Sequence, residues 1–207
     1  MVFSTKNFDS GLIASLRTAW QLFTLLVAIS VSTQAQAEPT PINITADNFD
    51  CLRSMTPVRG FFVDNLSGNI DATVAVASSN KGGEYPVGTV IQLVPGEVMV
   101  KHPKGVSPAT KDWEFFELSV SEAGSKIAKR GFVDVNNQFG GNCFACHVKA
   151  KPEWDMICET GHGCDPLPIS AAMISVIQKT DPRCDDKPTL TEQDLALLKQ
   201  LKQSLGK

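Results

Sequence analysis

The sequence has little histidine, little tyrosine and no large excess of charge of either sign, and each shortage narrows the range of functions. Three His, one Tyr and a net charge of −3 are spread over 207 residues. A chain without an excess of basic residues lacks the positive surface that binds phosphates, so we expect no nucleic-acid partner. Hydrophobic residues make up 43% and charged residues 20%, which excludes a disordered chain and a coiled coil and fits one ordinary globular domain.

Long apolar runs are also scarce, and the one of note lies near the start. A leader with Lys6 and Arg17 precedes the apolar residues 22–29, and the small side chains of Ala35 and Ala37 follow. This order is typical of a secretory signal peptide, and the run is shorter than the ~20 residues of a membrane span. We expect residues 1–37 to be removed, leaving an exported, soluble protein without a membrane span, periplasmic if the source is a Gram-negative bacterium.

The middle of the chain has the pattern of short β-strands separated by Gly, Pro and Asn turns. Apolar and β-branched residues alternate in part with polar ones. This favours an antiparallel sheet with one more hydrated face. Strands are expected over residues 58–63, 70–77, 89–94, 97–101, 113–120 and 127–135.

Helices are expected on both sides of this region, which makes the predicted fold class α+β, a mostly antiparallel sheet with flanking helices. Thr45 is placed to cap a short helix over residues 45–53, and a second helix is expected over residues 170–179. A last helix begins at Thr191, which forms a capping box with Asp194. Its apolar stripe is expected to consist of Leu195, Leu198 and Leu201.

Cys143-Phe144-Ala145-Cys146-His147 forms a C-x-x-C-H motif, the attachment sequence for c-type haem. The two thiols add to the two vinyl groups on one edge of the porphyrin. The next residue, on the same helical turn, brings its imidazole under the iron as the proximal ligand. The motif therefore predicts one covalent haem c held by Cys143 and Cys146, with His147 bound to the iron.

Two other uses of these cysteines compete with haem attachment. A structural zinc site could combine the motif with Cys158 or Cys164, but it needs reduced thiols, which an oxidising compartment disfavours. A redox-active C-x-x-C pair is typical of a βαβ context, and no such pattern precedes Cys143. Haem attachment is the favoured interpretation.

The sequence leaves the sixth position of the iron open. Met156 lies only nine residues after His147, too close to reach the other face easily. Met173 lies on an apolar helical stripe, where a core role is favoured, and His102 and His162 are expected in ordinary loops. An electron-transfer cytochrome with Met173 or His162 as the sixth ligand, docking on a redox partner protein, stays open as an alternative.

Three short stretches occur in a fixed order over about residues 50–158: residues 85–91, then residues 98–101 running on to 113–116, then residues 143–147 with 155–157. Together they resemble the cytochrome P-460 and cytochrome c′-beta family. The resemblance implies a mostly antiparallel β fold with the haem near the C-terminal end of the sheet. It also implies a His-ligated iron with an apolar distal side, and possible homodimers.

One position separates the two branches of this family. Members that oxidise hydroxylamine carry a haem-linked Lys two residues beyond the Gly-Thr-Val-Ile segment, and in this chain Leu93 holds that place. No proton-accepting distal carboxylate is identifiable, so a hydroxylamine oxidoreductase is a lesser alternative and enzymatic activity is not favoured. The resemblance to the c′-beta branch implies a five-coordinate iron that binds NO or CO. It aligns Arg59, Phe61 and Phe62 with distal-pocket positions.

Four cysteines lie outside the motif, an even number that in an exported chain predicts two disulfides with three possible pairings: Cys51, Cys158, Cys164 and Cys184. Residues 38–157 are expected to form the haem domain. Residues 158–207 extend past the body of the resemblance, and we expect disulfides to fix this helical extension onto the domain. Cys51 is the expected long-range partner.

Overall fold

The computed structural model describes residues 37–205. The chain divides into two units, residues 1–37 and 38–207. The expected signal peptide lies outside the described residues except at its last position. In the described part of the chain, no helix combines the length and apolar character needed to cross a membrane.

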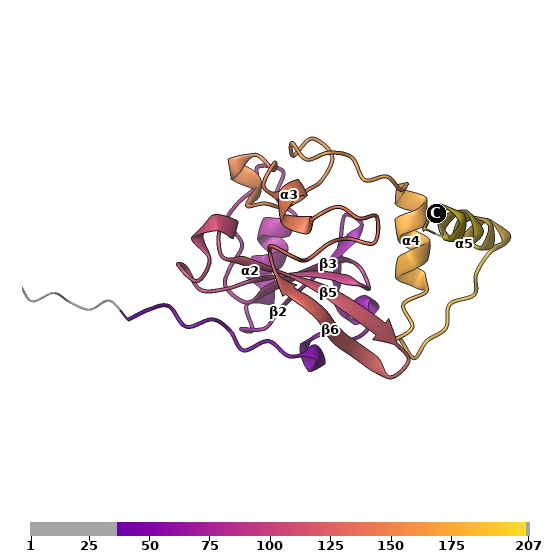
Figure 1. Ribbon diagram of the computed structural model, residues 1–207, viewed down its shortest axis with the longest axis horizontal. Coiled ribbons are helices and arrows are strands. Elements are labelled where there is room, and N and C mark those ends of the chain that lie inside the picture. The colour runs from indigo at the N-terminus through magenta and orange to yellow at the C-terminus, as the bar shows by residue number, and fades with distance from the viewer. Residues whose placement is uncertain (1–36, 206–207) are drawn as a thin grey trace, which may run out of the picture. The chain divides into compact units, whose positions relative to one another are not determined.

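The described residues form an α+β fold around one six-stranded sheet, in which every neighbouring pair of strands is antiparallel (Figure 1). The spatial order of the strands follows the sequence, so the sheet is a meander of hairpins. The strands are β1 Thr56–Val58, β2 Phe61–Asn65, β3 Thr89–Val94, β4 Glu97–Lys101, β5 Trp113–Ser121 and β6 Gly124–Gly131. This confirms the predicted antiparallel sheet.

Four α-helices and four short 3-10 turns complete the described chain. The α-helices are α2 Ile70–Ala77, α3 Cys143–His147, α4 Ala171–Lys179 and α5 Glu192–Leu205. The 3-10 turns are Ala46–Asn48, Leu52–Ser54, Pro108–Thr110 and Pro152–Trp154. The helix expected over residues 45–53 is thus two separate turns.

The segment Ile70–Ala77 is an α-helix, so the strand predicted there is wrong. Its β-branched residues suit a strand, but the preceding turn and the core impose a helix. The Asn65 carboxamide accepts from the N–H of Asn69 and donates to Thr73 Oγ1 at 3.0 Å. Thr73 and Ala77 are fully buried against the sheet, and the four-residue spacing of a helix allows this.

Two predicted strands have other bounds than expected, because residues in left-handed conformations divide the first and end the second early. Arg59 (φ 47°) and Gly60 (φ 106°) form a tight turn inside the strand expected over residues 58–63. That segment is therefore the hairpin of β1 and β2. Strand β6 ends at Gly131, which has φ 104°, and so stops four residues before the predicted end.

Both faces of the sheet carry an apolar core, so the expectation of one more hydrated face is wrong for the central strands. On one face a first core contains Phe61, Met99 and Phe115, with residues of α2 and α3 packed against it. On the other face a second core contains Val98 and Phe116 together with Ile44 and Phe49 of the N-terminal segment. The first core is the one that supports the Cys-containing helix.

Helices α4 and α5 pack on each other through a third core (Figure 1), and the capping box predicted for α5 is confirmed. Ser170 accepts from the Met173 N–H at the start of α4. At the start of α5, Thr191 N–H donates to the Asp194 carboxylate and Asp194 N–H donates to Thr191 Oγ1. Leu201 is buried in this core, but Leu195 is 55% exposed, so the predicted stripe is wrong at that residue.

Two disulfides join the four cysteines outside the motif. Cys51 pairs with Cys184, and Cys158 pairs with Cys164. This confirms two disulfides and Cys51 as the long-range partner. The first bridge joins residues 133 positions apart and ties the segment after α4 to the start of the β region.

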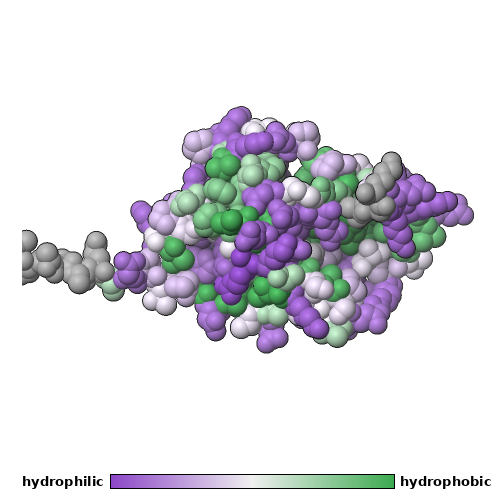
Figure 2. Space-filling model, viewed as in Figure 1, coloured by the Kyte–Doolittle hydropathy of each residue, from purple (hydrophilic) through white to green (hydrophobic). Residues whose placement is uncertain are grey.

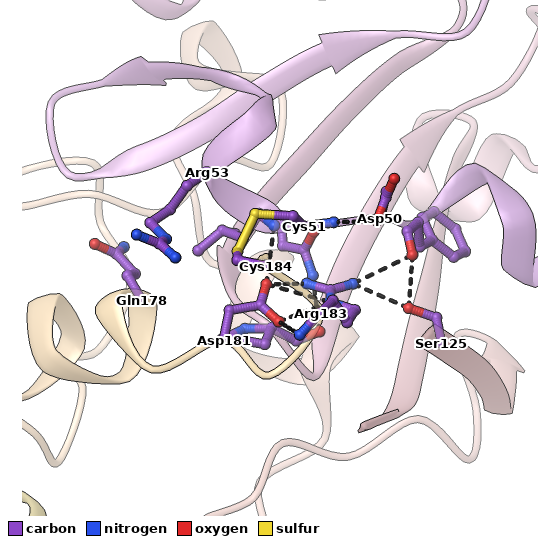
Figure 3. Close-up of polar contacts among 12 residues, drawn as sticks. Asp50, Cys51, Arg53, Ser125, Gln178, Asp181, Arg183 and Cys184 are labelled. Carbon is purple, nitrogen blue, oxygen red and sulfur yellow. Dashed lines mark hydrogen bonds and ion pairs between the residues drawn. A yellow bond between two sulfur atoms is a disulfide. The ribbon is translucent and has the colours of Figure 1, made fainter. Parts of the chain in front are cut away.

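A fully buried ion pair lies beside the Cys51–Cys184 bridge (Figure 3). The Arg183 guanidinium donates to the Asp181 carboxylate at 2.7 Å, and both side chains have no exposed surface. Asp181 also accepts from the Leu52 N–H at 2.8 Å, and Arg183 donates to Ser125 Oγ at 3.0 Å. The cluster therefore joins three distant parts of the chain by hydrogen bonds.

We expect Asp181 to contribute to acid unfolding. Burial raises the pKa of this carboxyl, but hydrogen bonds from Arg183 and Leu52 outweigh burial and hold the pKa below its usual value. Such a group stabilises the fold fully above its unfolded-state pKa of about 3.9, and the contribution is lost as the pH falls through the lowered value. The difference in unfolding free energy between wild type and Asp181→Asn should therefore narrow below about pH 4.

Denaturant titrations of both proteins at a series of pH values measure this difference. Glu114 also has a lowered pKa, because hydrogen bonds from His102 and Arg130 outweigh its burial, and the comparison cancels its contribution. A difference that stays constant throughout the acid range would contradict the prediction.

Candidate functional site

The C-x-x-C-H motif forms helix α3, which begins at a side-chain cap. Asn142 accepts from the Ala145 N–H through its side-chain oxygen at 2.9 Å. Its side-chain nitrogen donates to the Val133 and Val135 carbonyls. One side chain thus starts the helix and fixes it to the segment that follows β6.

Cys143 and Cys146 are both half-buried and carry free thiols. The other four cysteines of the chain are consumed by the two disulfides. Cys158 and Cys164 therefore have no thiolate to offer a zinc ion, so the zinc site considered from the sequence lacks its fourth ligand. The structure leaves free the two thiols that haem attachment requires.

Cys143 does not have the properties of a redox-active thiol. Burial, reinforced by the negative charge of Glu97 and Glu117, raises the pKa of this thiol to about 12. Reactive cysteines need the opposite, a lowered pKa that supplies thiolate near neutral pH. The alternative of a thiol redox pair is thus disfavoured.

His147 is oriented by one hydrogen bond and one aromatic contact. Its Nδ1 lies 2.7 Å from the Met156 carbonyl oxygen, and its ring packs edge-on against Phe115 at 5.4 Å between centroids. Because a carbonyl oxygen only accepts, Nδ1 carries the hydrogen and donates it. The neutral ring then has its free lone pair on Nε2, the atom available to a metal.

The protonation state of His147 agrees with this role. Burial lowers the pKa of the imidazole, and the hydrogen bond to the Met156 carbonyl opposes part of that shift. The ring is therefore neutral at pH 7, which is the form that ligates iron. Two free thiols and a neutral imidazole within one short helix make a donor set that fits haem c.

Apolar side chains surround helix α3. Phe144 contacts Phe115 and Phe132 in edge-to-face geometry, with centroids 6.4 and 5.4 Å apart. Half-buried apolar side chains from other elements, including Ile70 and Leu93, pack against the same first core. In this region of the face shown in Figure 2, hydrophobic residues are interspersed with hydrophilic ones. The immediate neighbours of the motif are thus mostly apolar, as a porphyrin requires.

The three residues expected at the distal pocket lie in three different surroundings. Phe61 is in the first core, the one that contacts α3. Phe62 pairs with Gln92, which pairs with Val98 of the second core, so Phe62 faces the opposite side of the sheet. Arg59 donates twice to the Glu159 carboxylate and once to a backbone carbonyl. The structure thus places Phe61 in the core beside the motif, joins Arg59 to the segment that follows α3, and puts Phe62 on the other face of the sheet.

The candidate sixth ligands are each occupied elsewhere. Met173 belongs to the third core, between α4 and α5. His102 accepts from the Ile42 N–H and bonds the Glu114 carboxylate through its other nitrogen. His162 stacks on Trp154 at 3.6 Å between centroids and bonds the Ile157 carbonyl through Nδ1. Both histidines lie in loops, as expected, but their side chains are buried and hydrogen-bonded within the fold.

The sequence did not indicate the partner of His147, the Met156 carbonyl. Asp155 and Met156 both have positive φ, 46° and 69°, and this conformation turns the carbonyl toward the imidazole. Every residue carries a carbonyl, and a left-handed conformation at a non-Gly residue has no pattern of its own. Only the fold reveals the contact.

Comparisons with protein-family models, with curated proteins and with solved structures found no match to this chain. The family resemblance drawn from the sequence therefore stays a prediction. Function follows from the chemistry of the site alone.

Proposed function

We propose that this protein is an exported c-type cytochrome with a single covalent haem. The thiols of Cys143 and Cys146 add to the two haem vinyl groups, and Nε2 of His147 is the proximal iron ligand. The observation that carries the proposal is the donor set of α3, two free thiols and a neutral imidazole whose Nδ1 is already engaged. When bound, the haem iron supplies a site for a small diatomic ligand or for one electron.

The surroundings of the site favour a five-coordinate iron that binds NO or CO. Met173, His102 and His162 are each held by other contacts, so none supplies a free sixth ligand. Aromatic and aliphatic side chains dominate the core beside α3. Water and anions are held poorly where nothing donates a hydrogen bond, whereas NO needs little polar help.

The remaining features of the chain agree with export. Two disulfides are typical of proteins from an oxidising compartment, and we propose the periplasm. Residues 38–157 would form the haem domain, akin to cytochrome P-460 and c′-beta. Residues 158–207 would be a helical extension that the Cys51–Cys184 bridge holds in place.

The absorption spectrum of the protein, produced in a host that attaches c-type haem, tests this proposal. We expect broad high-spin bands in the ferrous form and a clear shift on addition of CO or NO. Sharp low-spin α and β bands that ignore CO would instead mean six ligands and electron transfer, and the ligand-binding proposal would be abandoned.

A matched variant identifies the source of any sixth ligand. Met173→Ala should leave the spectrum unchanged, because Met173 packs between α4 and α5. If this variant converted a low-spin wild-type spectrum to high spin, Met173 would be the sixth ligand and the five-coordinate proposal would be wrong.

A further inference from the structure

The hydrogen bond that orients His147 depends on an unusual backbone conformation. The acceptor is the Met156 carbonyl, 2.7 Å from Nδ1, and the two residues Asp155 and Met156 are both left-handed. Left-handed residues other than Gly cost free energy and persist only where their surroundings hold them. Something must therefore fix this pair of residues.

Asp155 is fixed by hydrogen bonds from two strands and one loop. Its carboxylate accepts from Lys101 Nζ at 2.9 and 2.8 Å and from the Tyr85 N–H at 2.9 Å. Its carbonyl accepts from Trp113 Nε1 at 2.8 Å. Lys101 belongs to β4 and Trp113 to β5. Asp155 thus connects the sheet to Met156, whose carbonyl accepts the hydrogen bond from His147.

The Lys101–Asp155 ion pair lies in the interior, where its net contribution to stability is small. The two side chains are 5% and 6% exposed. Lys101 Nζ makes its remaining contacts inside the fold, donating to the Lys111 carbonyl and lying over the Trp113 ring. Desolvation of a buried pair offsets most of its attraction, so apolar residues of similar size often serve a fold equally well. Apolar residues in these two places would not supply a directional hydrogen bond.

We propose that Lys101 and Asp155 are positioning residues for the axial histidine. By fixing the Met156 carbonyl they hold the Nδ1–H hydrogen bond, which sets the tautomer of His147 and makes Nε2 a stronger electron donor. This inference rests on the proposed haem attachment for its functional meaning. Its structural content, control of the His147 ring from the sheet, concerns only residues of this chain.

Two substitutions at Asp155 separate the side chain from the backbone. Asp155→Gly keeps the left-handed conformation accessible but removes every bond of the carboxylate. Asp155→Asn retains an acceptor for the Tyr85 N–H and tolerates positive φ, but leaves Lys101 without its anion. We expect the larger effect in Asp155→Gly and a smaller one in Asp155→Asn.

In the haem-loaded protein the readouts are the iron–histidine stretching band and the reduction potential. Loss of the Nδ1–H bond weakens donation from Nε2, so the band should move to lower wavenumber and the potential should become more positive. Asp181→Asn is the control, because it disturbs another buried ion pair, which makes no hydrogen bond to His147, Asp155 or Met156. It should leave both values unchanged.

A second readout does not need haem. In the Cys143→Ala/Cys146→Ala background, nitrogen NMR of His147 reports which ring nitrogen carries the hydrogen. The Nδ1–H form should dominate, and its share should fall on introduction of Asp155→Gly. If wild type attaches no haem, the proposed function fails and the NMR result alone decides the positioning role. If haem attaches but Asp155→Gly changes neither the band nor the tautomer, the positioning role is wrong and the proposed function stands.

Discussion

Replacement of both Cys143 and Cys146 by alanine is expected to abolish covalent haem attachment completely. These are the free thiols of the chain, and a thioether forms only where a thiol can add to a vinyl group. Each single variant should keep one thioether. Haem retained after denaturing extraction, together with the absorption of the extracted pigment, measures the outcome.

The matched control for this loss is Cys158→Ala/Cys164→Ala. It also removes two cysteines, which pair with each other across six positions close to the same loop. This variant should still attach haem covalently. Covalent haem in the Cys143→Ala/Cys146→Ala protein, or its loss only in the control, would contradict the assignment of the motif.

Arg183→Met is expected to cause the largest loss of stability among single substitutions of ion-paired residues, about 3–5 kcal/mol. The variant leaves the Asp181 carboxylate without its cation at a position with no exposed surface. It also removes the bond from the guanidinium to Ser125 Oγ. The free energy of unfolding from denaturant titration measures the loss, which should appear as a lower midpoint with an unchanged slope.

Arg53→Met provides the comparison. Arg53 pairs with Asp186, whose side chain is 77% exposed, and pairs at the surface contribute about 1 kcal/mol or less. Both substitutions exchange Arg for Met, and the two arginines lie in the same region of the fold, near the Cys51–Cys184 bridge (Figure 3). Equal losses from the two variants would mean that burial does not determine how much the Asp181–Arg183 pair contributes to the free energy of unfolding.

Much of the sheet was predictable because its strands are short, apolar and bounded by turn residues. The strands β3, β4 and β5 begin where the sequence pattern predicts, and the caps of α4 and α5 are local signals carried by Ser170 and Thr191. The helix Ile70–Ala77 was not predictable from local pattern. Its start depends on Asn65 and its buried face depends on the sheet.

The candidate site divides in the same way. The identity and spacing of Cys143, Cys146 and His147 are enough to predict haem attachment without any structure. The pairing of the other cysteines could not be derived, because four cysteines allow three arrangements. Neighbouring side chains of β2 point to opposite faces of the sheet, so Phe61 and Phe62 lie on different faces. Which of the two lies on the face of the motif follows only from the strand register.

Under the proposed export, the long disulfide depends on the order in which the cysteines enter the oxidising compartment. A chain that enters the oxidising compartment N-terminus first brings in Cys51 before any other cysteine, and its partner Cys184 last. To reach the native pairing, Cys51 must therefore not form a disulfide with Cys143 or Cys146. Wrong pairs are corrected only by slow thiol exchange. Haem attachment would withdraw those two thiols from the competition, so maturation of the cofactor would also direct the correct closure of the disulfide.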